Sequence, residues 1–137
     1  CLRLLSRRWS TRPKRQHLFY SHSLHTMVEQ IDAPTLASAR ADTLADAVLL
    51  DVREPWEFAT ARIANSINVP MSALAARVDE VRELAGDDRP LVVICHHGGR
   101  SMQCAHFLAR QGIGRPINLA GGIDAWSLHV DHAVPRY

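Results

Sequence analysis

Residues 91–101 of this 137-residue chain have the sequence Leu91-Val92-Val93-Ile94-Cys95-His96-His97-Gly98-Gly99-Arg100-Ser101. The four aliphatic residues that open the stretch predict a short strand that is buried on both faces. The two adjacent glycines allow a sharp turn, and serine at position 101 is a residue type that caps the N-terminus of a helix. From residue 102 apolar positions recur at helical spacing, and Gly112 is a natural stop. The stretch therefore predicts a strand, a tight loop and a helix.

Cys95 lies where the predicted strand meets the predicted loop. The backbone amides of residues 96–101 would curl around its sulfur at the positive end of a helix, where negative charge is stabilised. A helix N-terminus and a nearby cation such as Arg100 favour the thiolate form of a cysteine. Amides arranged in this way would also hold a transferred group that carries negative charge. We interpret Cys95 as a nucleophile; the alternative is a small buried residue that ends a strand.

The composition predicts one globular domain. A chain of this length has room for one domain with a real core, and 47% hydrophobic with 22% charged residues is ordinary for it. Residues 1–26 hold six of the 16 lysines and arginines and no acid, so residues 27–137 carry ten basic and 14 acidic side chains, a net charge of −4. This balance argues against nucleic acid as a partner. No membrane span is expected, because a run of about eighteen apolar residues does not occur.

The N-terminal segment differs in kind from the rest. Residues 1–26 are predicted to be a disordered basic tail ahead of a domain at 27–137. A transit-like segment, upstream sequence translated before a start at Met27, and a remnant of a tag are three origins that fit it, and we favour the second. The three cysteines, Cys1, Cys95 and Cys104, form no disulfide framework and fit a reducing compartment. We expect a cytoplasmic protein, or a mitochondrial one if the tail is a genuine transit peptide.

Strand and helix signals alternate through residues 27–137. Further strands are expected at 48–52, 66–70 and 117–119, and helical segments at 31–41, 56–59, 71–84 and 123–129. Strands separated by helices predict an α/β fold, a parallel sheet with helices on both faces. Ligands of such folds bind beyond the carboxyl ends of the strands. The segments 51–53, 95–101 and 121–122 follow such ends, so three loops are expected to meet on one rim.

Five segments resemble the rhodanese family in both content and order. They are Asp51-Val52-Arg53-Glu54-Pro55-Trp56-Glu57-Phe58, residues 63–70, the loop 95–101, residues 118–126 and Val134-Pro135-Arg136-Tyr137. The resemblance covers nearly all of residues 27–137 and is to single-domain sulfurtransferases of the bacterial type. It implies the three-layer rhodanese-like fold, with no cofactor. Residues 61–66 depart from the family pattern, which affects a turn of the scaffold rather than the sulfur chemistry.

The resemblance also implies a role for each loop residue. Cys95 would become persulfidated, while His96, His97, Gly98, Gly99, Arg100 and Ser101 would cradle the outer sulfur. Arg53 and Arg100 would shape an anionic pocket and attract a small anionic donor. The expected activity is that of a thiosulfate sulfurtransferase, which passes sulfane sulfur to cyanide, a thiol or a sulfur-acceptor protein. A protein-to-protein sulfur relay or a non-catalytic binding module is the alternative.

Two other chemistries are less favoured. A cysteine-dependent phosphatase resembles this pattern but has five residues between its cysteine and arginine, whereas four intervene between Cys95 and Arg100. A metal site is not expected, because adjacent histidines beside a cysteine do not easily converge on one tetrahedral ion. The side chains of His96 and His97 are expected to face solvent. Cys104, Trp56 and Trp126 are interpreted as packing residues.

Overall fold

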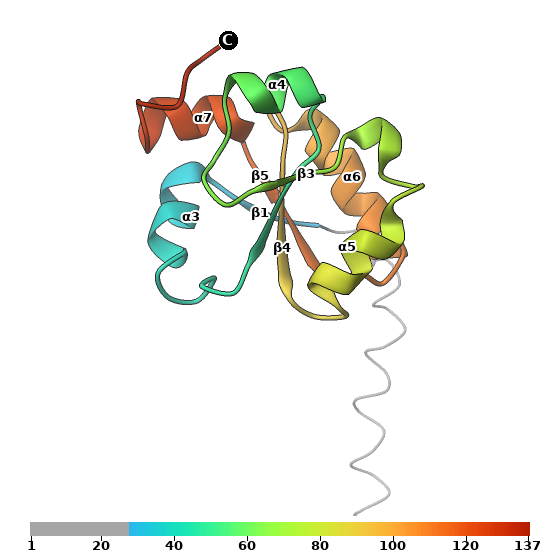
Figure 1. The fold of residues 1–137 in the computed structure, drawn as a ribbon. Coiled ribbons are helices and arrows are strands. Elements are labelled where there is room, and N and C mark those ends of the chain that lie inside the picture. The colour runs from blue at the N-terminus through green and yellow to red at the C-terminus, as the bar shows by residue number, and fades with distance from the viewer. Residues whose placement is uncertain (1–27) are drawn as a thin grey trace, which may run out of the picture.

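The computed structural model describes residues 28–137, and its centre is a parallel sheet of five strands (Figure 1). The strand order is β1-β5-β4-β2-β3, and all four pairings are parallel, as the sequence predicts. The strands are β1 (Glu29–Ile31), β2 (Val48–Asp51), β3 (Ile67–Asn68), β4 (Pro90–Ile94) and β5 (Arg115–Leu119). The sequence did not predict β1, a three-residue edge strand. The predicted basic tail at residues 1–26 lies outside the described residues.

Strands β4 and β2 form the buried middle of the sheet. Every residue of both strands is buried, and their register pairs Val48 with Leu91 and Asp51 with Ile94. Continuous burial is what a parallel strand requires when helices cover both of its faces. The register brings the residues that follow Asp51 and Ile94 to the same edge of the sheet. Cys95 therefore begins its loop beside the end of β2.

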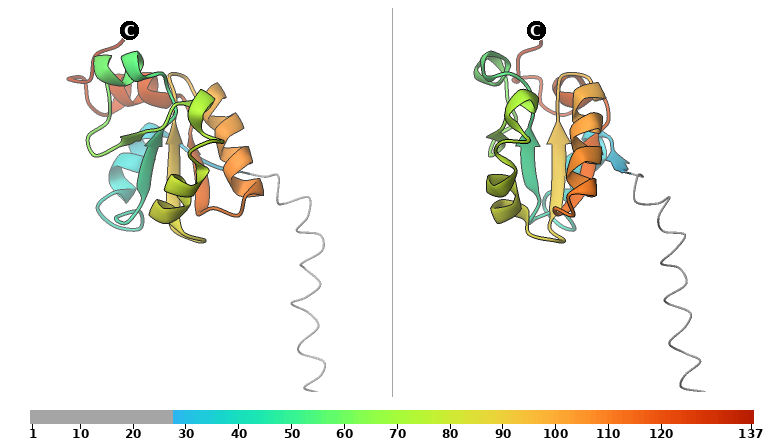
Figure 2. Two further views of the ribbon diagram at one scale, coloured as in Figure 1. Left: turned by 45° about the vertical axis from the view of Figure 1, so that its right-hand side comes forward. Right: turned by 90° about the vertical axis from the view of Figure 1, so that its right-hand side faces the viewer.

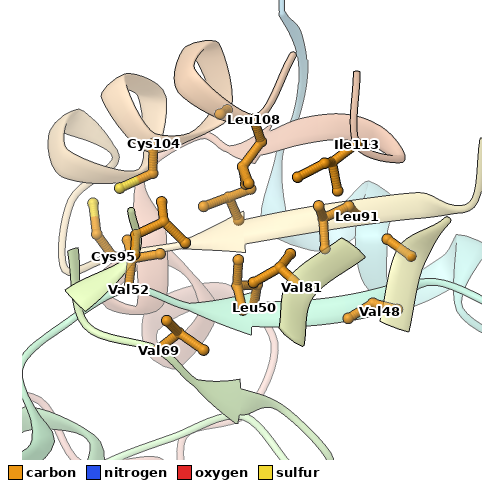
Figure 3. Close-up of a cluster of buried hydrophobic side chains, with 14 residues drawn as sticks. Val48, Leu50, Val52, Val69, Val81, Leu91, Cys95, Cys104, Leu108 and Ile113 are labelled. Carbon is orange, nitrogen blue, oxygen red and sulfur yellow. The ribbon is translucent and has the colours of Figure 1, made fainter. Parts of the chain in front are cut away.

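Helices cover both faces of the sheet, which gives three layers (Figure 2). The helical segments are α3 (Ala33–Ala39), α4 (Pro55–Thr60), η1 (Met71–Ala73), α5 (Val78–Ala85), α6 (Gly99–Arg110) and α7 (Gly122–His129). Helices α5 and α6 pack on one face through a core that includes Val81 and Leu108 (Figure 3). Helices α3 and α7 pack on the other through Leu36 and Trp126. Helix α4 lies above the carboxyl ends of the strands (Figure 1).

Two predicted helices differ from those observed. The single helix predicted at residues 71–84 is two segments, η1 and α5. The backbone amide of Met71 donates to Val52 O at 2.9 Å, which ties η1 to the end of β2, and a new helix begins after Arg77. Helix α6 begins at Gly99 with Gly98 as its N-cap, so Ser101 lies inside the first turn and is not the cap.

The start of α3 agrees with its prediction. The Asp32 side chain accepts a hydrogen bond from the Thr35 amide at 2.9 Å, and Pro34 lies in the first turn. Both features satisfy or remove amides that have no partner within the helix. Within residues 28–137, no helix is both long and apolar enough to cross a membrane.

The packing of α6 on the sheet gives a stability prediction. Leu108 is completely buried in the core of that face, so Leu108→Ala is expected to lower the free energy of unfolding by about 3 kcal/mol. Leu128→Ala is the control, because Leu128 is 41% exposed, and it should cost less than about 1 kcal/mol. Urea unfolding measures both changes. Equal losses for the two variants would contradict the packing described.

Candidate active site

The sulfur of Cys95 lies at the carboxyl end of β4, against the first turn of α6 (Figure 3). Cys95 is 1% exposed, and two groups approach its Sγ atom. The Gly98 amide donates to Sγ at 3.0 Å, and the Ser101 hydroxyl lies 3.2 Å from it. Both groups come from the segment that follows the strand. The predicted arrangement of a cysteine enclosed by its own loop is therefore present.

The N-terminus of α6 leaves backbone amides free for a ligand. Its N-cap is Gly98, whose φ angle of 111° is one that glycine adopts readily. Glycine has no side chain that could cap the helix. The amides of Gly99, Arg100 and Ser101 have no acceptor within the helix, because the first amides of any α-helix lack one. A twelve-residue helix also places partial positive charge at this end. Such a helix N-terminus stabilises negative charge beside it.

The loop is fixed from behind by the start of α7. The amides of Ile123 and Asp124 donate to the carbonyl oxygens of Cys95 and His96, at 2.9 and 3.1 Å. A side chain at Gly122 would overlap those two carbonyl oxygens, and its φ of 60° is also one that other residues rarely adopt. The pair Gly121-Gly122 therefore lets α7 reach the back of the Cys95 loop.

Ser101 connects Cys95 to a series of polar side chains that runs from the buried Asn118 to the exposed Gln30. Its Oγ lies 2.5 Å from Asn118 Oδ1, and Asn118 Nδ2 donates to Gln30 Oε1 at 3.0 Å. Because Asn118 offers an acceptor at this point, the Ser101 hydroxyl donates its one proton either to Asn118 or to Cys95. A Cys95 thiol can donate to Ser101 while Ser101 donates to Asn118.

Arg100 is not a free cation. Its Nη1 and Nη2 atoms donate to Glu57 Oε1 and Oε2 at 2.7 and 3.0 Å, a bidentate ion pair. Glu57, on α4, also accepts from the Glu54 amide at 2.9 Å and from the Tyr137 hydroxyl at 2.9 Å. Hydrogen bonding to Arg100 lowers the pKa of Glu57 to about 2, although burial opposes the change. Glu57 therefore stays ionised and holds Arg100 in place.

Arg53 was expected to face a pocket and attract an anionic donor, but it lies in the interior of the protein. Arg53 is fully buried, and its guanidinium donates to Asp51 through Nε and Nη2, with an Nη2–Oδ2 distance of 2.7 Å. Its Nη1 atom donates to Tyr137 Oη at 2.7 Å. Burial disfavours the charge, and the bonds to Asp51 and Tyr137 outweigh that cost, so the pKa of Arg53 is raised. A buried charge is tolerated only with such partners. Arg53 therefore supports the site from the interior of the protein, and its guanidinium does not face a sulfur donor in solvent.

The two histidines lie in an aromatic stack at the rim. The His96 ring stacks on Tyr137 at 4.1 Å and on His97 at 4.0 Å between centroids. His97 extends outward with a side chain 69% exposed, as expected, whereas His96 is partly buried, and burial lowers its pKa. Nitrogen atoms of both rings and a carboxylate oxygen of Asp124 lie within 4.8 Å of one another. Parallel rings direct their lone pairs side by side, and Asp124 is bound by Arg136 at 3.0 Å, so this group is poorly arranged for one ion.

The other packing interpretations have mixed outcomes. Cys104 is buried in the core between α6 and the sheet, and burial raises the pKa of its thiol to about 11, which suits an inert residue. Trp126 is likewise buried in the opposite core. Trp56 is not a core residue, since it is 63% exposed and meets the Tyr137 ring edge-on at 5.9 Å.

Sequence reasoning missed four residues that support the site. Glu57, Tyr137, Asn118 and Asp124 all lie in segments that carry the family resemblance, but none of them was assigned a role from the sequence. A glutamate three residues after Glu54, with proline between, has a local signal, because it forms the capping box that begins α4. Its second partner, Arg100, is 43 positions away, and no local pattern specifies such a pair.

Comparisons with known proteins agree on one family. The sequence model of the rhodanese-like domain family matches residues 33–129. A sulfurtransferase of Allochromatium vinosum is 40% identical over 103 residues, which are 75% of this chain and 92% of that protein. The thiosulfate sulfurtransferase GlpE of Pseudomonas syringae is 39% identical over 80 residues, 58% of this chain and 72% of GlpE. The crystal structure of a rhodanese-related protein from Thermoplasma volcanium superposes with a TM-score of 0.62 at 33% identity, covering 78% of this chain and 95% of that one.

The contact between Gly122 and the Cys95 loop gives a second prediction. Gly122→Ala is expected to lower the free energy of unfolding by about 2 kcal/mol more than Gly112→Ala. Both glycines have positive φ, at 60° and 70°, but a methyl group at Gly112 would meet open space. The difference in urea unfolding therefore isolates the overlap with the Cys95 and His96 carbonyls. Equal losses would mean that close approach to α7 does not fix the loop.

The lowered pKa of Glu57 predicts a pH dependence of stability. A carboxyl whose folded-state pKa is depressed contributes stability above its ordinary pKa of 4.5, and this contribution is lost as pH falls toward about 2. The difference in free energy of unfolding between the wild-type chain and Glu57→Gln should therefore shrink from pH 4.5 to pH 2. Denaturant unfolding at several pH values measures it. A difference that stayed constant across this range would contradict the role of the ionised carboxylate.

Proposed function

This chain belongs to the rhodanese-like domain family, and we propose that it is a sulfurtransferase that moves sulfane sulfur through a persulfide on Cys95. The observation that carries this proposal is the position of Cys95 Sγ against the N-terminus of α6, 3.0 Å from the Gly98 amide. A persulfide is an anion, and backbone amides can hold it without a proton donor strong enough to quench it. The names of the similar proteins support sulfur transfer as the reaction.

The first half-reaction loads Cys95. Its thiolate attacks the outer sulfur of a donor such as thiosulfate, so that a new S–S bond forms as the bond to the rest of the donor breaks. The leaving group takes the electron pair of the broken bond, and for thiosulfate it is sulfite. The outer sulfur remains on Cys95 as Cys95–S–S⁻. The amides of Gly98 and of the first turn of α6 would receive this charge.

The second half-reaction unloads the outer sulfur. A nucleophilic acceptor, cyanide in an assay or a thiol in the cell, attacks it, and Cys95 leaves as the thiolate. Ping-pong kinetics follow from the covalent intermediate. A sulfur-acceptor protein would perform the same step, which makes a protein-to-protein relay the alternative with the same chemistry. The four-residue spacing between Cys95 and Arg100 favours one sulfur atom over a tetrahedral phosphate as the transferred group.

A mass measurement tests the proposal. The chain is incubated with thiosulfate, its intact mass is recorded, and the modified residue is located by peptide mapping. We expect a gain of about one sulfur atom at Cys95, absent in Cys95→Ser and retained in Cys104→Ser, which is the matched control because Cys104 is buried in the core. Added cyanide should remove the sulfur. No adduct with thiosulfate or with a small persulfide would contradict the proposed function.

A further inference from the structure

Three arginines of the Cys95 loop and of the segments that support it are each paired with a carboxylate. Arg100 pairs with Glu57 at 2.7 Å, Arg53 with Asp51 at 2.7 Å, and Arg136 with Asp124 at 3.0 Å. The expectation that Arg53 and Arg100 attract a dianion rests on their charge being available. These three pairs add no net fixed charge to the loop and its supports, and residues 27–137 as a whole are acidic.

The pair closest to the chemistry is Arg100 with Glu57. The Arg100 side chain is 37% exposed, whereas that of Glu57 is only 6% exposed, so solvent screens the carboxylate weakly. Four donors hold Glu57: both terminal nitrogens of Arg100, the Glu54 amide and the Tyr137 hydroxyl. The carboxylate is therefore fixed, and its negative charge accompanies Arg100 whenever a donor enters.

We propose that Glu57 determines donor specificity, by cancelling the charge of Arg100 so that the loop disfavours dianionic donors relative to persulfides of uncharged or weakly charged thiols. This inference rests on the proposed sulfur transfer. Glu57 touches neither donor nor Cys95 in this account; it is a positioning residue that acts through Arg100.

The chemistry of the two donors explains the discrimination. With thiosulfate, a dianion must approach a thiolate, and sulfite leaves as a dianion in turn. With a persulfide R–S–SH, Cys95 forms a bond to the outer sulfur as the S–S bond between the outer and inner sulfurs breaks. R–S⁻ leaves with the electron pair of that bond and takes up the proton released from the new persulfide, which gives R–SH and Cys95–S–S⁻. The persulfide reaction concentrates less negative charge beside Glu57. Backbone amides are enough for this transition state, whereas the approach of a dianion would be faster beside a free cation, and Glu57 has neutralised the cation of Arg100.

The test compares two donors on the full chain with and without Glu57. Second-order rate constants for loading Cys95 are measured by quenched-flow mass spectrometry with thiosulfate and with 2-hydroxyethyl persulfide, whose carrier is uncharged. Glu57→Gln should raise the thiosulfate rate constant about tenfold and change the persulfide rate constant by less than about twofold. A ratio of the two rate constants that does not change, or that moves toward the persulfide, would overturn the inference.

Glu80→Gln is the matched control. It removes the same charge from another bidentate arginine pair, Arg77 with Glu80, which is exposed on the surface at α5. It should leave the donor ratio unchanged, so an equal shift in both variants would also overturn the inference by assigning the effect to net charge.

A measurement on the wild-type chain does not depend on any variant folding. If Glu57 cancels Arg100, the thiosulfate rate constant should not fall when salt is raised from low to physiological concentration. A several-fold fall would show that the loop attracts the dianion and would overturn the inference. Failure of both donors to load Cys95 would instead contradict the proposed function itself, so the two failures are distinguishable.

Discussion

The arrangement of the site depends on the contact between the Cys95 loop and the first turn of α7. The carbonyl oxygens of Cys95 and His96 accept hydrogen bonds from the amides of Ile123 and Asp124. Both oxygens therefore point toward α7. The amides of the loop then point toward the sulfur of Cys95, and that of Gly98 lies 3.0 Å from Sγ. The contact requires a residue without a side chain at position 122. One backbone constraint thus joins the end of β4, the end of β5 and the N-termini of two helices.

A second network supports the loop from the side of β2 and α4. The buried pair of Asp51 and Arg53 leads through the Tyr137 hydroxyl to Glu57, and from there to Arg100 on α6. Each charged side chain in this network has a partner of opposite charge, which is the condition under which buried charges are tolerated. The consequence for chemistry is that the loop offers oriented amide dipoles with little net charge. The sequence suggested that free arginines attract an anionic sulfur donor. In the structure, backbone amides instead lie beside the sulfur, and the charge of both arginines is already paired.

The sequence predicted those parts of the structure that are encoded locally. The aliphatic runs of β2 and β4, the Asp32 cap of α3 and the turn at Gly98-Gly99 each carry their own signal. The edge strand β1 was missed, because three residues are too few to show a periodicity, whereas β3 falls within the strand predicted at residues 66–70 and is shorter than that prediction. The break between η1 and α5 was missed because one apolar stripe continues across it. The role of Arg53 was misjudged because the sequence does not show that Asp51, the carbonyls of residues 57 and 61 and the distant Tyr137 together enclose its guanidinium.

In the proposed mechanism, backbone amides of the Cys95 loop hold the transferred sulfur. A high-resolution crystal structure of the chain, loaded with sulfane sulfur before freezing, tests this claim most directly. We expect a second sulfur on Cys95 that points into the loop, within hydrogen-bond distance of the amides of Gly98 and the first turn of α6, while Arg100 stays bound to Glu57. A second sulfur that points away from these amides, or that lies against Arg100 after it has left Glu57, would contradict the account.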